Sequence, residues 1–185
     1  MRLAIALAVL LVATAAMANP IAIELYVDFD PPNFVPSVYP DPYTTVDAYV
    51  VAELYHPQPV ESISFDLNVW GGTATVSGPF VSGDPSVQVQ IVENGITVFN
   101  PDCWDTYPAT LGYLPLLYLG SPGLVEILPH GDHGHTFHTC GDPGETFDYC
   151  YVMHGGLGME PSGPVSYCGN PVENVTWGAV KALFR

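Results

Sequence analysis

Prolines and glycines interrupt this chain throughout, and they limit its fold more than any other feature. The 185 residues include 19 prolines and 18 glycines, all of them after the first 18 residues. Proline lacks a backbone N–H and fixes φ, while glycine weakens the interior of a helix, so long helices are excluded. The chain must therefore build its core from short strands joined by turns.

Segments of alternating apolar and polar residues lie between these breaks. The clearest is 61–70, in which Ile63, Phe65, Leu67 and Val69 alternate with mostly polar residues. A period of two places the apolar side chains on one face of a strand. We therefore expect a strand here with one face on the core and the other in water.

Further strands are expected at 21–27, 46–54, 87–91, 96–99, 111–119, 123–128 and 146–153. Asn94 and Gly95 predict a two-residue type I′ turn, because both residues accept positive φ. In the last segment the alternation places Phe147 and Met153 on one face with the tyrosines between them. So many short strands predict an all-β fold, an antiparallel two-sheet β-sandwich or jelly roll.

The first 18 residues predict a cleaved secretory signal peptide. Arg2 precedes an apolar run over 3–12, and small residues occupy positions 16 and 18. The run is shorter than the roughly 20 residues that a membrane-spanning helix needs. We expect a β-sandwich domain at 19–173, located outside the cell or on its surface, with the periplasm as an alternative.

The last twelve residues, 174–185, predict a short C-terminal helix. Trp177, Val180 and Phe184 fall on one face at helical spacing. Gly178 weakens the helix, which should form only when its tryptophan face is docked on something. That face is a candidate site for binding another protein, or it closes the end of the chain's own sandwich.

Four cysteines predict disulfides if the chain is exported. Three pairings are open, and nearest-neighbour closure is favoured, joining Cys103 to Cys140 and Cys150 to Cys168. Each bridge would stabilise the fold by about 2–4 kcal/mol.

The chain is strongly acidic, with 19 Asp and Glu against three Lys and Arg and a formal net charge of −16. Such a surface repels phosphate backbones and anionic lipid, which excludes nucleic acid as a partner and argues against a membrane surface. It attracts cations, and Ca²⁺ is the natural extracellular candidate. The alternative is that the charge serves solubility.

Four of the six histidines lie in the segment PHGDHGHTFHTCGD, residues 129–142. His133 and His135 are two residues apart, so on a strand both would project from one face, as in many Zn²⁺ and Cu²⁺ sites. The candidate ligands are His133, His135, His130, His138 and Asp132, with the distant His154 as a further one. The alternative is an irregular loop, where nearby carboxylates would raise the pKa of each imidazole.

The sequence assigns no catalytic residue. It contains neither an H-E-x-x-H helix nor a G-x-S-x-G elbow, and after His135 the next glutamate is Glu145, too distant for the cupin pattern. Aromatic residues offer another chemistry, since Trp70, Trp104, Trp177 and eleven tyrosines suit a face that stacks on sugar rings. The alternative is that Trp70 and Trp104 anchor the core.

The C-terminal TWGAVKALFR and the segment PDCWDTYPATLG at 101–112 resemble a group of uncharacterised secreted bacterial proteins. In that group a terminal motif of this kind recurs on a single β-rich domain. The resemblance implies an extracellular bacterial setting and carries over no enzymatic residue. The alternating strands are also similar to those of immunoglobulin-like, cohesin-like and carbohydrate-binding sandwiches, an analogy of fold alone.

These observations favour a secreted, non-catalytic extracellular module in cell-surface structure, adhesion or matrix assembly. Its expected partners are other extracellular proteins, or a second copy that pairs through the strand at 21–27 and builds a fibre. The alternatives are a Zn²⁺- or Cu²⁺-binding protein or metalloenzyme, and a carbohydrate-binding module. No resident cofactor is expected, and Ca²⁺, Zn²⁺ and Cu²⁺ are the cations that the side chains could bind.

Overall fold

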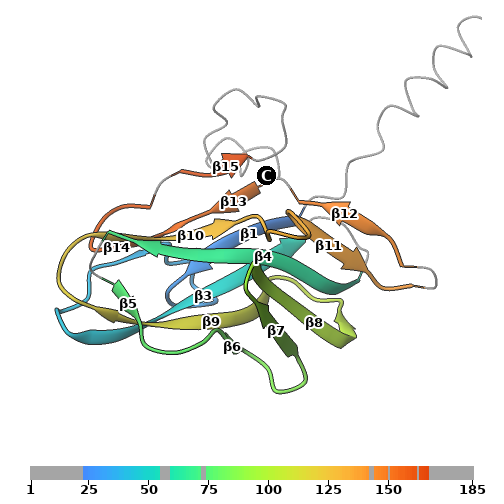
Figure 1. Cartoon of the computed structure of the whole chain (residues 1–185), viewed down its shortest axis with the longest axis horizontal. Helices are drawn as coiled ribbons and strands as arrows, with labels where there is room; N and C mark the ends of the chain where they lie inside the picture. Colours follow the sequence, from blue (N-terminus) through green and yellow to red (C-terminus); the bar gives the residue numbers. More distant parts are fainter. Residues whose placement is uncertain are drawn as a thin grey trace, which may run out of the picture.

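The computed structural model describes residues 23–54, 59–71, 74–141, 144–149, 151–161 and 163–166. Throughout this part of the chain the regular structure is β-strand, arranged in two facing sheets (Figure 1). The predicted signal peptide, the C-terminal helix with Trp177, Val180 and Phe184, and the cysteines Cys150 and Cys168 lie outside the described residues. Within the described residues no helix is long and apolar enough to cross a membrane.

The first sheet has seven strands, with the path β15-β13-β1-β3-β9-β5 and β6 also paired with β9. Its members are β1 (Ile23–Asp28), β3 (Thr44–Leu54), β5 (Ala74–Val76), β6 (Val81–Ser82), β9 (Ala109–Tyr118), β13 (Tyr151–Met153) and β15 (Val165–Ser166). Strand β1 is antiparallel to β3 and parallel to β13. The predicted antiparallel sandwich is confirmed for the other strand pairs, and the exceptions are β1 with β13 and, in the second sheet, Ser37–Val38 with Gly155–Leu157. Strands far apart in sequence can pair in either direction.

The second sheet has eight strands, with the path β12-β11-β4-β10-β14-β2 and β8 paired with both β4 and β7. Its members are β2 (Ser37–Val38), β4 (Val60–Trp70), β7 (Gln88–Val92), β8 (Gly95–Trp104), β10 (Gly123–Leu128), β11 (Thr136–Thr139), β12 (Thr146–Asp148) and β14 (Gly155–Leu157). Strand β4 pairs with β8 and with β11 over the same residues, so these two strands lie on its opposite edges.

The core between the sheets confirms the predicted alternation. On β4, Ile63 and Phe65 are fully buried, and Leu67 and Val69 pack partly against the same cluster. The inward residues of β1 and β3 complete the core from the other sheet. Trp104 packs against this core, whereas Trp70 is 49% exposed, so the expectation that both tryptophans anchor the core is wrong for Trp70.

Strands β7 and β8 form the predicted hairpin with a different turn. Val92 pairs with Gly95, which leaves Glu93 and Asn94 as the turn residues. Neither has a positive φ, while Gly95, with φ of 147°, begins the next strand. The hairpin is confirmed and the type I′ turn is wrong.

The segment 146–153 is two strands rather than the predicted one, and the strands belong to different sheets. Tyr149 lies at the crossing, buried, with its hydroxyl donating to the Ser64 carbonyl oxygen at 2.8 Å. Phe147 and Met153 therefore do not share one face. The alternation continues through the crossing, so the sequence pattern alone does not reveal where the chain changes sheet.

Strand β1 is paired along both edges. Glu24 to Tyr26 pair with β13, and the whole strand pairs with β3. The predicted self-association through residues 21–27 therefore has no free backbone edge in this part of β1, and strand pairing with a second copy would need another edge.

Candidate functional site

The histidine segment begins with a tight turn over residues 130–134. His130 and Gly134 exchange backbone hydrogen bonds of 2.9 and 2.7 Å, and the His130 and His133 rings lie 4.7 Å apart. The amide of Asp132 donates to His130 Nδ1 at 3.1 Å. The His130 ring is buried, and His133 is an exposed turn residue rather than a strand residue. His133 and His135 therefore do not form the two-residue strand pair that a metal site was expected to start from.

The β7–β8 turn holds this loop in place. Asn94 accepts from the Gly131 amide at 2.7 Å through its backbone oxygen, and its side-chain amide donates to the Asp132 carboxylate. A Cβ on Gly95 would lie 2.6 Å from Cδ2 of His130 and 2.8 Å from the Phe65 carbonyl oxygen. Asn94 and Gly95 thus hold the histidine loop against the hairpin. These contacts account for an asparagine and a glycine at the two positions, although they do not form a type I′ turn.

We expect Gly95→Ala to lower the free energy of unfolding by about 2 kcal/mol, since the added methyl group meets the His130 ring and the backbone is at positive φ. Chemical denaturation measures the loss. Gly134→Ala is the matched control, because this glycine also has positive φ (68°) while a Cβ there meets nothing within 4 Å. Equal losses in the two variants would show that φ alone, and not the contact with His130, sets the cost.

Burial lowers the pKa of two other histidines. His135 faces Tyr149 with ring centroids 5.0 Å apart, and desolvation lowers its pKa against the opposing effect of Asp148. His154 is buried, accepts from the Ile127 amide at 3.1 Å through Nδ1, and has its pKa lowered by desolvation against Glu126. The expectation that carboxylates raise the pKa of the loop histidines is wrong for His135, because burial outweighs the neighbouring charge of Asp148.

These two shifts predict a loss of stability in mild acid. A histidine with a lowered folded-state pKa stays neutral in the fold, while the unfolded chain takes up a proton as the pH falls below about 6.5. The stabilisation is complete above that pH and decreases below it. We expect Tm to fall by a few degrees between about pH 7.5 and pH 5.5, measured by differential scanning calorimetry.

The variant His154→Asn supplies the control, since its Oδ1 replaces Nδ1 as acceptor and does not titrate. Its Tm should depend less on pH than that of the native chain. Identical pH profiles for the two proteins would contradict the assignment.

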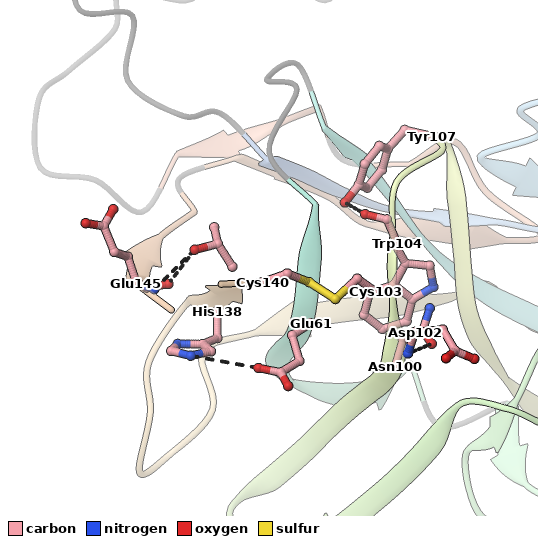
Figure 2. Close-up of a disulfide and its surroundings, with 10 residues drawn as sticks. Glu61, Asn100, Asp102, Cys103, Trp104, Tyr107, His138, Cys140 and Glu145 are labelled. Atoms are coloured by element: carbon pink, nitrogen blue, oxygen red, sulfur yellow. Dashed lines mark hydrogen bonds and ion pairs between the residues drawn. A yellow bond between two sulfur atoms is a disulfide. The ribbon is translucent and has the colours of Figure 1, made fainter. Parts of the chain in front are cut away.

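His138 and the disulfide lie near the start of β4 (Figure 2). His138 Nδ1 contacts Thr146 Oγ1 at 3.0 Å, and its Nε2 is 3.9 Å from a Glu61 carboxylate oxygen. The predicted bridge between Cys103 and Cys140 is present. It joins the end of β8 to the residue after β11, so it links strands on opposite edges of β4.

His130, Asp132 and His133 thus share the 130–134 turn, whereas His135, His138 and His154 each lie in a different environment. In the described ranges no three His, Cys, Asp or Glu side chains come together as a group that could hold a metal ion. The cation expectation stays a prediction, with elemental analysis of untagged protein grown with added zinc and copper as its test. We expect well under one equivalent of either metal, and a full equivalent would restore the metalloprotein alternative.

A different site lies on the outer face of the first sheet. The inward residues of β1 alternate with Glu24, Tyr26 and Asp28, which point away from the core. The register places Asp28 opposite Tyr49, and Tyr49 opposite Tyr113 of β9. The Tyr49 and Tyr113 rings lie 5.3 Å apart at 44°, a cross-strand aromatic pair on the face opposite the core.

The loop that follows β1 folds back over this face. Asp28 Oδ1 accepts from the amides of Asp30 at 3.0 Å and Val35 at 2.8 Å. Phe34 packs edge-on against Tyr26, with ring centroids 5.1 Å apart. The buried Asp28 carboxylate therefore fixes both ends of the loop.

Together the loop and the sheet border an open pocket of about 500 Å³. The residues that line it are Tyr26, Phe29, Asp30, Pro31, Pro32, Tyr49, Val51, Gly83, Pro108, Thr110 and Tyr113. We call this the tyrosine pocket. Its volume lies within the range of sites that bind small molecules.

Negative charge surrounds the tyrosine pocket. Burial and then Glu53, Asp28 and Glu24 raise the pKa of Tyr26. Burial, Asp47, the Tyr113 ring and Asp30 raise the pKa of Tyr49. The phenols therefore stay protonated, as hydrogen-bonding groups at the edge of an anionic face.

The sequence contains part of the signal for this pocket. Tyr26 and Tyr49 occupy outward positions of two predicted strands, so their orientation follows from the alternation. The pairing of β3 with β9, which brings Tyr113 beside Tyr49, and the return of the loop through Asp28 depend on long-range register. Alternation does not encode that register.

The fold is similar to that of cohesin modules. The seventh type I cohesin of ScaB from Pseudobacteroides cellulosolvens matches with a TM-score of 0.53 and 9% identity, over 82% of this chain and 96% of that chain. A chain of a type I cohesin–dockerin complex from Clostridium thermocellum matches with a TM-score of 0.51 and 14% identity, over 74% and 92%.

The cohesin module of a family 33 glycoside hydrolase from Clostridium perfringens gives a TM-score of 0.50 and 15% identity, over 79% and 96%. Identities this low show a shared fold alone. No protein-family model matches the chain. A search of curated proteins gives no match either.

Proposed function

We propose that this chain is an extracellular protein-binding module that engages its partner through the outer face of the β1–β3–β9 sheet. The observation that carries the proposal is the tyrosine pocket, an aromatic hollow held on a rigid sheet face by the buried Asp28 carboxylate. Aromatic residues that are partly buried in concave surfaces are typical anchor points of protein interfaces.

The fold supports the proposal by analogy. One of the similar cohesins was solved as a cohesin–dockerin complex, in which a sandwich of this kind has a protein partner. The expected signal peptide and the Cys103–Cys140 disulfide fit a location outside the cytoplasm. Function lies in the site rather than in the fold, so the test addresses the pocket itself.

The test begins with cross-linking on cells that produce the protein, and mass spectrometry identifies the cross-linked partner. The partner is then purified, and its affinity for the native chain is measured by calorimetry. We expect a one-to-one complex that Tyr49→Ala weakens by about tenfold, since truncation of an aromatic anchor commonly costs this much.

Trp70→Ala is the matched control, because Trp70 is an exposed aromatic residue on the second sheet. It should leave the affinity unchanged, and Tyr49→Phe should retain most of it. If Tyr49→Ala and Trp70→Ala reduce the affinity equally, with both variants folded by circular dichroism, the interface does not lie on this sheet face. A chain that cross-links to no protein would contradict the proposal.

Sugar binding at the same pocket is a second candidate. The Tyr26, Tyr49 and Tyr113 rings offer stacking surfaces, and Thr110 and Asp30 offer polar groups for sugar hydroxyls. A panel of neutral oligosaccharides, with tyrosine fluorescence as the readout, distinguishes the two functions. Saturable binding that Tyr49→Ala abolishes would favour the sugar.

A further inference from the structure

The tyrosine pocket combines aromatic walls with a carboxylate at its rim. Tyr49 and Tyr113 form one wall, and Asp30 comes from the loop that forms the other. The Asp30 carboxylate is held in place, since its Oδ2 accepts from the Asn33 side-chain amide at 3.0 Å. None of the residues that line the pocket is basic.

Among the described residues, the charged side chains near the pocket are all carboxylates. Asp47 lies two positions before Tyr49 along β3, and Glu53 lies two positions after Val51, so all four side chains share its outer face. The Lys and Arg residues of the chain are Arg2, Lys181 and Arg185, all outside the described residues. The carboxylates that raise the pKa of Tyr49 disfavour a phenolate, and the same field favours a positively charged guest.

We infer that the tyrosine pocket receives an arginine side chain of the partner protein, with its guanidinium against the Tyr49–Tyr113 wall and paired with Asp30. This inference rests on the proposed function and specifies its chemistry. Arginine fits better than lysine because its planar guanidinium stacks on aromatic rings and forks onto a carboxylate. A pocket of about 500 Å³ accommodates this side chain with adjoining backbone.

The test uses a short peptide as the probe. Acetyl-Gly-Arg-Gly-amide is titrated into the isotope-labelled full chain at low ionic strength, with the same peptide carrying citrulline in place of arginine as the neutral control. We expect saturable amide shifts for the arginine peptide at Gly83 and Thr110, which line the pocket. The citrulline peptide should cause none, and added salt should weaken the arginine complex.

Two substitutions separate the roles of charge and ring. Asp30→Asn should weaken peptide binding about threefold to tenfold, as expected for loss of one exposed charge pair near an aromatic face. Glu93→Gln, in the β7–β8 turn of the other sheet, makes the same change in net charge and should have no effect. Tyr49→Leu keeps an apolar side chain in the wall while removing its π face, so it should also weaken binding.

The outcomes separate this inference from the proposed function. If the arginine and citrulline peptides bind alike, or neither binds at millimolar concentration, the inference is overturned. The proposed function then stands if Tyr49→Ala still weakens the protein partner. If the arginine peptide binds and Asp30→Asn weakens it while no protein partner exists, the cation site holds and the proposed function fails.

Discussion

Removal of the Cys103–Cys140 disulfide is expected to lower the free energy of unfolding by about 4 kcal/mol. The bridge closes a loop with a sequence separation of 37 residues, and the loss of chain entropy in the unfolded state gives this magnitude. For a chain of this size the change corresponds to a fall in Tm of about 10 °C. Urea unfolding of the double variant Cys103→Ala/Cys140→Ala measures it.

The single variant Cys103→Ala is the control, because it also breaks the bridge but leaves one free thiol. Thiol counting on the folded protein verifies that the bridge is absent in each case. The single and double variants should lose nearly the same stability. A loss below about 1 kcal/mol in the double variant would mean that the unfolded chain is already compact in this region.

Asp28→Ala is expected to lower the free energy of unfolding by about 3 kcal/mol, because the buried carboxylate accepts from two backbone amides and hydrogen bonds to charged groups are the stronger ones. Besides this loss of overall stability, we expect the loop at residues 29–35 to open locally. Release of the loop would remove Phe34 from Tyr26 and open the tyrosine pocket, so limited proteolysis should cut between residues 29 and 35.

Asp28→Asn tests whether the acceptor or the charge matters. Its amide oxygen can still accept from the Asp30 and Val35 amides, so it should retain more than half of the stability lost in the alanine variant and should protect the loop from proteolysis. If both variants lose equally and both are cut, the negative charge and not the acceptor geometry holds the loop.

Local patterns predicted the longer strands and missed the short strands β2, β5, β6, β11, β14 and β15. The alternation at 61–70 corresponds to β4, with Ile63 and Phe65 buried as expected, because the side-chain direction in a strand depends on residue parity alone. The predicted pairing of Cys103 with Cys140 is also confirmed. The sequence favours it because these two cysteines are neighbours along the chain. The two-sheet sandwich follows from these strands.

What the patterns missed depends on contacts between distant segments. At 146–153 the alternation continues through Tyr149 although the chain changes sheet there. Asn94 and Gly95 are typical of a type I′ turn, but here they contact the loop at residues 130–134. To predict the tyrosine pocket one would have to know the register of β3 with β9 and the return of the loop to Asp28. None of these features has a local periodicity.

The contact between Gly95 and His130 places a joint restriction on how this sequence can change. The two residues are 35 positions apart, yet the absent side chain at 95 is the space that the imidazole fills. A substitution at either position changes which side chains fit at the other. In related chains the two positions should therefore vary together, with a smaller residue at 130 wherever the residue at 95 is alanine. His130 is in this respect part of the architecture of the β7–β8 hairpin, and packing explains its place there without any further chemistry.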